Sequence, residues 1–253
     1  MADPTLAPNA AFALVLLVVA FASAVKGALG FGFPLIAVPL SATLIGSRTA
    51  VVLIAVSVVF SNFLVLFRGG GTAGEFRRFA GLLAGVIVGT VIGAQLLSRL
   101  DPGVLSLLVG VTALLLAGLG LLNKTPHLSI HAERIAGPTV GLAAGVMGGT
   151  TGIFAPLLAG YLQSLQVGKR AFVFWLTALF FAGAVVQVLS YSRLGLYSQV
   201  PVAYALVTFV PAAVGTLAGF RVQDRLPVPL FRRLVLLLLL AVSLRLIWSA
   251  ASR

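Results

Sequence analysis

The sequence predicts an all-α, polytopic membrane protein made of two homologous halves, and three observations lead to this fold class. The 253 residues are 60% hydrophobic and only 9% charged, with a mean hydropathy of +1.15. A soluble domain, by contrast, is about a quarter charged. Apolar runs close to the roughly 20 residues that a helix needs to cross a bilayer recur along the chain. A stretch rich in glycine and proline also occurs twice, 122 positions apart.

The first half, residues 1–122, opens with an apolar segment that is interrupted near its centre. Residues 26–34 read Lys-Gly-Ala-Leu-Gly-Phe-Gly-Phe-Pro, between apolar runs at 10–25 and 33–45. Both runs are shorter than a typical span, and proline fits the first turn of a helix, so we expect two short helices that form a hairpin. Three longer runs follow and are expected to be membrane-spanning helices, at 49–67, 79–97 and 104–122.

Residues 123–134 form a connecting loop, and residues 135–253 repeat the pattern of the first half. The apolar runs of this second half are 135–147, 154–165, 171–191, 200–220 and 230–249. The second break, at 148–156, reads Gly-Gly-Thr-Thr-Gly-Ile-Phe-Ala-Pro. The pairs that match at the spacing of 122 are Gly30 and Gly152, Pro34 and Pro156, Leu35 and Leu157, Gly46 and Gly168, and Arg48 and Arg170. A later block, 89–100, matches 215–226 at a spacing of 126. Each half is therefore expected to hold one Gly/Pro-broken helical hairpin and about three to four membrane-spanning helices.

The distribution of basic residues favours a hairpin at each break over a full crossing. If all eight longer apolar runs cross, eight basic residues fall on one side and seven on the other, which gives no orientation. If 10–45 and 135–165 each enter and leave by one face, the count becomes eleven against four. The positive-inside rule prefers this second arrangement, in which the two halves are inverted and the hairpins enter from opposite faces. A full crossing by the strongly apolar run 10–25 is the alternative.

Lys26 is the most informative single residue, because it places a charge inside an apolar segment. Such a charge costs at least about 2.5 kcal/mol at the centre of a membrane helix and marks a functional site by default. No acidic residue lies inside an apolar run to pair with it, so an anionic substrate is a candidate partner. The alternative is that the lysine reaches to the membrane interface. Its repeat counterpart is Gly148, so any contribution from lysine is one-sided.

The two breaks together are the predicted substrate site, near the bilayer midplane. A helix amino end presents unpaired N–H groups and partial positive charge, which favour an anion, and glycines before it allow close approach to the backbone. The alternative is that the glycines only allow close helix packing. The candidate substrate-binding residues are Lys26, Gly30, Phe31, Gly32, Phe33, Pro34, Gly149, Thr150, Thr151, Gly152, Phe154 and Pro156.

The roles of five further polar residues can each be interpreted in two ways. Arg48 and Arg170 each begin the helix after a break, where they either orient the chain in the bilayer or attract anions to a vestibule. Ser61, Asn62 and Gln187 lie at membrane depth, where they either donate to an anion or bond neighbouring helices together.

A glycine ladder has a structural interpretation. Glycines recur every fourth residue along one predicted helix, at Gly81, Gly85, Gly89 and Gly93. Small residues at this spacing let two membrane helices approach closely. We therefore expect a close helix–helix contact along this face.

Composition argues against several function classes. The chain has no cysteine, which removes disulfides, thiolate metal sites and cysteine nucleophiles. His127 and His131 have metal-pair spacing but no acidic partners, so we expect no metal and no cofactor. The excess of basic residues lies between apolar runs, as in cytoplasmic loops, so nucleic acid is not an expected partner. Lys26 is the only clear titratable group at membrane depth, and we therefore expect that the protein is not an enzyme.

The broken segments resemble those of a known family, the sulfite exporter TauE/SafE family of membrane permeases, also called toluene sulfonate uptake permeases. The resemblance rests on the sequence at 27–39, on its repeat at 148–158, and on the glycine-to-arginine turns at 46–48 and 168–170. The glycine positions of the family fall on Gly30, Gly32 and Gly152. Phe31 and Phe33 depart from the unbroken glycine run that members often have.

The resemblance implies a multi-pass protein of the bacterial inner membrane that moves small sulfur-containing anions such as sulfite, organosulfonates or sulfoacetate. The expected partners are therefore a small anionic substrate and the lipid bilayer. A selective anion channel and a membrane assembly factor that transports nothing are the alternatives. The sequence leaves open the substrate, the direction of transport, the coupling ion and the oligomeric state.

Overall fold

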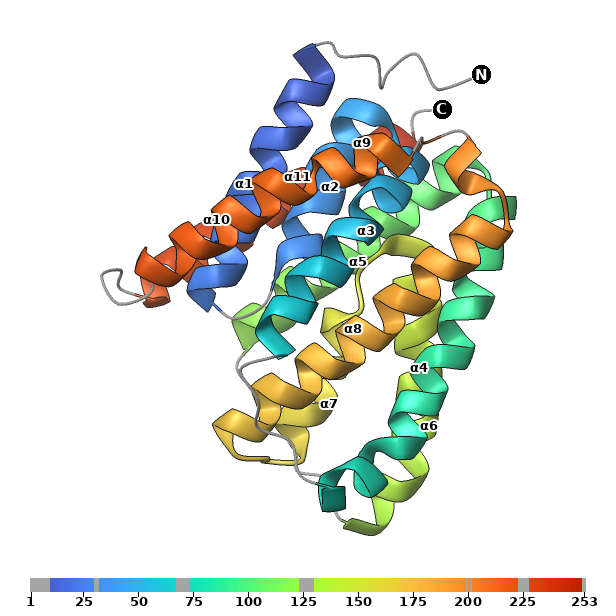
Figure 1. The fold of residues 1–253 in the computed structure, drawn as a ribbon, viewed down its shortest axis with the longest axis vertical. Helices are drawn as coiled ribbons and strands as arrows, with labels where there is room; N and C mark the ends of the chain where they lie inside the picture. Colours follow the sequence, from blue (N-terminus) through green and yellow to red (C-terminus); the bar gives the residue numbers. More distant parts are fainter. Residues whose placement is uncertain are drawn as a thin grey trace.

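The computed structural model describes residues 10–29, 32–66, 73–122, 130–198, 200, 202–222 and 228–251, and this part of the chain is helical, without a β-strand. Figure 1 shows the helices gathered into one bundle. Within these described ranges, four helical segments are long and apolar enough to cross a membrane, namely Ala10–Ala28, Glu75–Arg99, Arg170–Arg193 and Ala203–Arg221. The predicted all-α membrane fold is confirmed.

The described part of the first half contains five helices, and apart from the earlier start of α4 their bounds lie within a few residues of the apolar runs. The helices are α1 (Ala10–Leu29), α2 (Phe33–Ile45), α3 (Ser47–Leu66), α4 (Ala73–Arg99) and α5 (Pro102–Leu122). The predicted break therefore lies between α1 and α2. At 1.5 Å per residue, α1 is about 30 Å long, so it is not the short helix expected from the run 10–25 and is long enough to cross a bilayer. By contrast, α2 is about 20 Å long and too short to cross alone.

The second half repeats this order with one additional interruption. Its helices are α6 (Ile130–Thr151), α7 (Ala155–Ser164), α8 (Lys169–Arg193), the short 3-10 helix η2 (Leu196–Ser198), α9 (Val202–Val207), α10 (Phe209–Val222) and α11 (Val228–Ala251). The run 200–220, expected as one helix, is divided at Thr208. Pro211 follows the division, and because proline has no N–H it leaves the carbonyl of Val207 without its usual helical donor.

The predicted glycine ladder packs α4 directly against α6. A Cβ atom added to Gly85, Gly89 or Gly93 would lie 2.2–2.3 Å from a backbone oxygen of α6. The oxygens belong to Pro138, Leu142 and Val146, in that order, so the two helices run parallel. The ladder is thereby confirmed as a close-packing surface, in which only glycine fits.

The same contact occurs between α10 and α1. A Cβ atom on Gly215 would lie 2.2 Å from the oxygen of Ala20, and one on Gly219 would lie 2.1 Å from the oxygen of Ala24. Gly215 is the counterpart of Gly89 at the spacing of 126, and Ala20 is the counterpart of Leu142 at the spacing of 122. Each half therefore packs its hairpin against the other half, with equivalent residues in the two contacts.

The α6–α7 hairpin begins and ends at the same end of the bundle. The Tyr161 hydroxyl near the end of α7 donates to the backbone oxygen of Glu133, in the first turn of α6, over 3.0 Å. The Glu133 carboxylate also pairs with Arg78 near the start of α4, at 2.5 and 2.7 Å. These contacts place the open end of this hairpin beside the start of α4.

The α1–α2 hairpin opens at the opposite end of the bundle. Arg48, directly after α2, donates to the backbone oxygen of Leu100 just beyond α4, over 2.6 Å. Near the start of α1, the ring of Phe12 packs edge-on against Tyr204 of α9, with ring centroids 5.1 Å apart. Tyr197, shortly before α9, donates to the oxygen of Val52 in the second turn of α3. Both ends of this hairpin thus lie at the end of the bundle where α4 ends.

Candidate functional site

Lys26 is buried near the end of α1 and is bonded to α3. Its side chain is only 4% exposed. Its Nζ donates to Ser61 Oγ over 2.9 Å and to Asn62 Oδ1 over 2.6 Å. Ser61 and Asn62 are also buried. The lysine therefore does not reach the interface, and two of its three N–H groups are committed to neutral acceptors.

The charge of Lys26 has no negative partner in the described chain. The carboxylates there are Glu75, Asp101 and Glu133, and Lys26 pairs with none of them. An isolated ion in a low-dielectric interior is costly unless it is paired. A buried ammonium held by a hydroxyl and an amide oxygen therefore retains a strong attraction for an anion.

The orientation of the Asn62 amide follows from the chemistry of lysine. An ammonium group only donates, so the amide oxygen must face Lys26 and the Nδ2 group must point elsewhere. In the described chain this NH₂ group has no protein partner. Lys26 and Asn62 thus both have N–H groups left for a ligand.

The first break ends in an open amino end of α2. Gly32 precedes the helix with φ of 107°, a left-handed conformation that favours glycine, and Phe33 and Pro34 form the first turn. The first helical bond runs from Ile36 N to Gly32 O, at 3.2 Å. A Cβ atom on Gly32 would meet nothing within 4 Å. Gly30 and Phe31 lie outside the described residues.

The second break is closed by its own hydrogen bonds. Thr150 Oγ1 donates to the oxygens of Val146 and Gly93, and Thr151 Oγ1 donates to Met147 O over 2.7 Å. Gly152, with φ of 76°, donates its N–H to Gly148 O over 2.7 Å. Both hydroxyl groups therefore donate their protons to backbone oxygens, and these protons are not available to bind an anion.

Two side chains of α8 hold the end of α6 by hydrogen bonds. Gln187 Nε2 donates to Gly148 O over 3.1 Å and to Tyr191 Oη over 2.6 Å, and Tyr191 donates to Gly149 O over 2.6 Å. Gln187 thus bonds two neighbouring helices together, which is one of the two interpretations given for it above. Tyr191 was not identified from the sequence, because a single tyrosine at a helix end carries no pattern.

The two breaks contact α3 at different levels. The nearest side chains to a Cβ atom on Gly152 would be Val38 of α2 and Val51 of α3, at 3.2 and 3.7 Å. Lys26 is bonded to Ser61, ten residues further along α3. At 1.5 Å per residue, these levels are roughly 15 Å apart. The polar site at Lys26 and the second break are therefore separated along the bundle.

The two vestibule arginines lie at the starts of α3 and α8. Arg48 is half-buried, and its Nε is buried without a hydrogen-bond partner. Arg170 is exposed. Each follows the turn after a hairpin, so neither lies at the level of Lys26.

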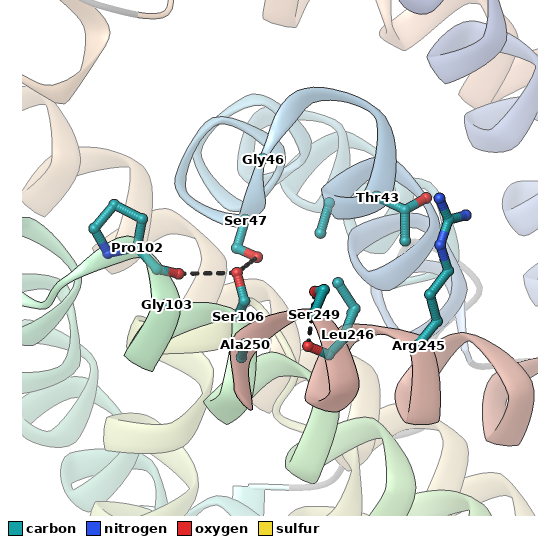
Figure 2. A pocket seen from close by; sticks show the side chains of 11 residues that line it. Thr43, Gly46, Ser47, Pro102, Gly103, Ser106, Arg245, Leu246, Ser249 and Ala250 are labelled. Atoms are coloured by element: carbon teal, nitrogen blue, oxygen red, sulfur yellow. Dashed lines mark hydrogen bonds between the residues drawn. The ribbon is translucent and has the colours of Figure 1, made fainter. Parts of the chain in front are cut away.

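A polar cavity of about 210 Å³ lies close to the turn between α2 and α3. Figure 2 shows residues of this turn facing the start of α5 and the end of α11. Ser47 and Ser106 share a hydrogen bond of 2.8 Å, and Ser106 donates onward to Pro102 O. The exposed Arg245 also lines the cavity. It opens at the end of the bundle where Arg48 lies.

The described residues contain no group of three metal-ligating side chains. His127 lies outside the described residues, and the side chain of His131 does too. The arrangement at Lys26 is instead one of hydrogen-bond donors and a positive charge, which suits an oxyanion.

A comparison with protein-family models matches residues 15–246 to the family described as Sulfite exporter TauE/SafE. The match includes both breaks and nearly the whole chain. No curated protein and no solved structure matches the chain.

Proposed function

The chain belongs to the sulfite exporter TauE/SafE family, and from this premise we propose that it carries a small sulfur-containing anion across the bacterial inner membrane, bound at Lys26. Sulfite, an organosulfonate and sulfoacetate are the candidate substrates. The observation that carries the proposal is the buried Lys26 ammonium, which is bonded to two neutral side chains and to no carboxylate of the described chain.

The chemistry of the site matches an anion with several oxygen acceptors. Lys26 offers a positive charge and an uncommitted N–H group, and Asn62 offers its Nδ2 group. Hydrogen bonds to charged groups contribute about 1.5–3 kcal/mol each. Further donors are available at the amino end of α2, where the first-turn N–H groups have no partner within the helix.

The proposed arrangement in the bilayer is an inverted repeat. The eleven-to-four distribution of basic residues places the start of α4 on the cytoplasmic side. The α6–α7 hairpin then enters from the cytoplasm and the α1–α2 hairpin from the outer face, because the first opens at the end of the bundle where α4 starts and the second at the end where α4 ends. In this arrangement Ser61 and Lys26 lie nearer the cytoplasmic end of α3, where a substrate for export would be loaded.

The proposal is tested by anion efflux from proteoliposomes that contain the purified protein, under a set membrane potential. Sulfite, sulfoacetate, sulfate and chloride are compared. We expect efflux that saturates with concentration and selects one sulfur-containing anion. Flux that rises linearly with concentration would favour the selective anion channel. A folded, inserted protein that moves none of the four would contradict the proposal and favour an assembly factor.

A further inference from the structure

The residues around Lys26 have counterparts in the second half at the spacing of 122. We call Lys26, Gly32, Ser61 and Asn62 the first half-site, and their counterparts the second half-site. In the same order, the second half-site consists of Gly148, Phe154, Gly183 and Ala184. Every polar side chain of the first half-site is thus replaced by glycine or alanine. The single glycine, Gly32, is replaced by phenylalanine.

The phenyl ring of Phe154 fills the second half-site. A Cβ atom on Gly148 would lie 2.1 Å from the ring, and one on Gly183 would lie 2.8 Å from it. The ring therefore lies between α6 and α8, in direct contact with both backbones. In the first half the corresponding positions are Lys26 and Ser61, which bond to each other. The ring occupies the position that corresponds to the lysine side chain and its acceptor.

Two polar side chains of α8 lie next to the second half-site, and their protons are already used. Gln187 Nε2 donates to Gly148 O and to Tyr191 Oη, and Tyr191 donates to Gly149 O. Phe154 itself is 1% exposed. The four residues of this half-site provide no positive charge and no polar side chain to replace the water around an anion. In the first half-site, by contrast, a Cβ atom added to Gly32 would meet nothing within 4 Å.

We propose that Phe154 is a built-in plug that closes the second half-site and leaves the first as the one open to a small anion. This inference rests on the proposed function for the identity of the ligand. The duplicated chain then uses its halves differently. The second hairpin is fixed by the Phe154 ring and by two hydrogen-bonding side chains of α8, whereas the first is held to α3 through the lysine that the substrate contacts.

Cysteine labelling tests this proposal without requiring transport, because the chain has no native cysteine. The protein is purified in detergent, where reagents reach both faces, and single cysteines are introduced as Asn62→Cys or Ala184→Cys. Each is treated with a small anionic methanethiosulfonate, and the rate of modification is measured by mass. Ala184→Cys is also combined with Phe154→Ala or, as a matched control, with Phe180→Ala, which removes a neighbouring ring 6.4 Å away.

We expect Asn62→Cys to react and Ala184→Cys to react at least about tenfold more slowly, because the ring must first move away. Phe154→Ala should restore the rate at Ala184→Cys, whereas Phe180→Ala should not. Equal rates for the two single cysteines would overturn the proposal. So would a slow rate that persists in a folded Ala184→Cys/Phe154→Ala protein, as judged by size-exclusion chromatography. If labelling follows the expected order but no anion is transported, the proposed function fails and the role of Phe154 stands.

Discussion

Removing the Tyr191 hydroxyl should destabilise the protein, because it leaves identifiable buried polar groups without their hydrogen-bond partner. Tyr191 is fully buried, and its hydroxyl donates to Gly149 O while it accepts a bond from Gln187. Tyr191→Phe keeps the ring and removes both bonds. Gln187 retains its bond to Gly148 O but loses the acceptor of its other N–H, so that N–H and the oxygen of Gly149 are both left unsatisfied.

A buried carbonyl that loses its donor costs about 1–3 kcal/mol. A loss of ~2 kcal/mol corresponds to roughly 4–8 °C in Tm for a chain of this size. The assay is the temperature at which half of the detergent-purified protein is lost from the size-exclusion peak. Tyr197→Phe is the matched control, because its hydroxyl makes one long bond of 3.4 Å to Val52 O. The reasoning is refuted if Tyr191→Phe retains wild-type stability or loses no more than the control.

Two further predictions concern packing and topology. Gly89→Ala and Gly215→Ala each place a Cβ atom 2.2 Å from a backbone oxygen, so each variant should lose about 1–3 kcal/mol of stability. The control Gly118→Ala, whose added Cβ atom meets nothing within 4 Å, should lose none. Equal stability of all three variants would contradict the repeated contact. Single cysteines at Thr72 and Gln223 should be labelled from the same, cytoplasmic side of the membrane; labelling from opposite sides would rule out the inverted arrangement.

The helices and their interruptions could largely be predicted from the sequence. Apolar runs of membrane length gave the positions of α3, α4, α5 and α8, and the Gly/Pro stretches gave the breaks before α2 and α7. These features depend on local composition. The division at Thr208 was missed, because the run 200–220 is apolar throughout and Pro211 was not weighed against it.

The contacts of the site could be predicted only in part. The charge inside an apolar run singled out Lys26, and Ser61 and Asn62 were recognised as polar groups at membrane depth. Their bonds to Lys26 depend on how α1 packs against α3, 35 and 36 residues away. The ring of Phe154 between Gly148 and Gly183 is likewise a long-range contact. Periodicity does not report such contacts, although the repeat alignment identifies the positions once one half-site is known.

The different hydrogen bonding of the two hairpins has a consequence for the transport cycle. The end of α6 is held by Gln187 and Tyr191, which donate hydrogen bonds to backbone oxygens. Binding of an anion at Lys26 does not displace these bonds. The end of α1 is held through the bonds of Lys26 to Ser61 and Asn62, with which a substrate bound as proposed would compete. A ligand shifts a conformational equilibrium only by binding one state better. The first hairpin is therefore the element that substrate binding can release.

The most direct test of the central claim is sulfite efflux by Lys26→Met in proteoliposomes. Methionine keeps the length and burial of the side chain but removes the charge and the donors. The loss of charge-assisted hydrogen bonds should reduce flux at limiting sulfite at least about tenfold. Arg193→Gln, which removes an exposed charge at the end of α8, should stay within about twofold of the wild type by the small effect expected of surface substitutions. Near-normal sulfite flux by a folded Lys26→Met protein would contradict the account, because Lys26 would then have no part in binding the anion.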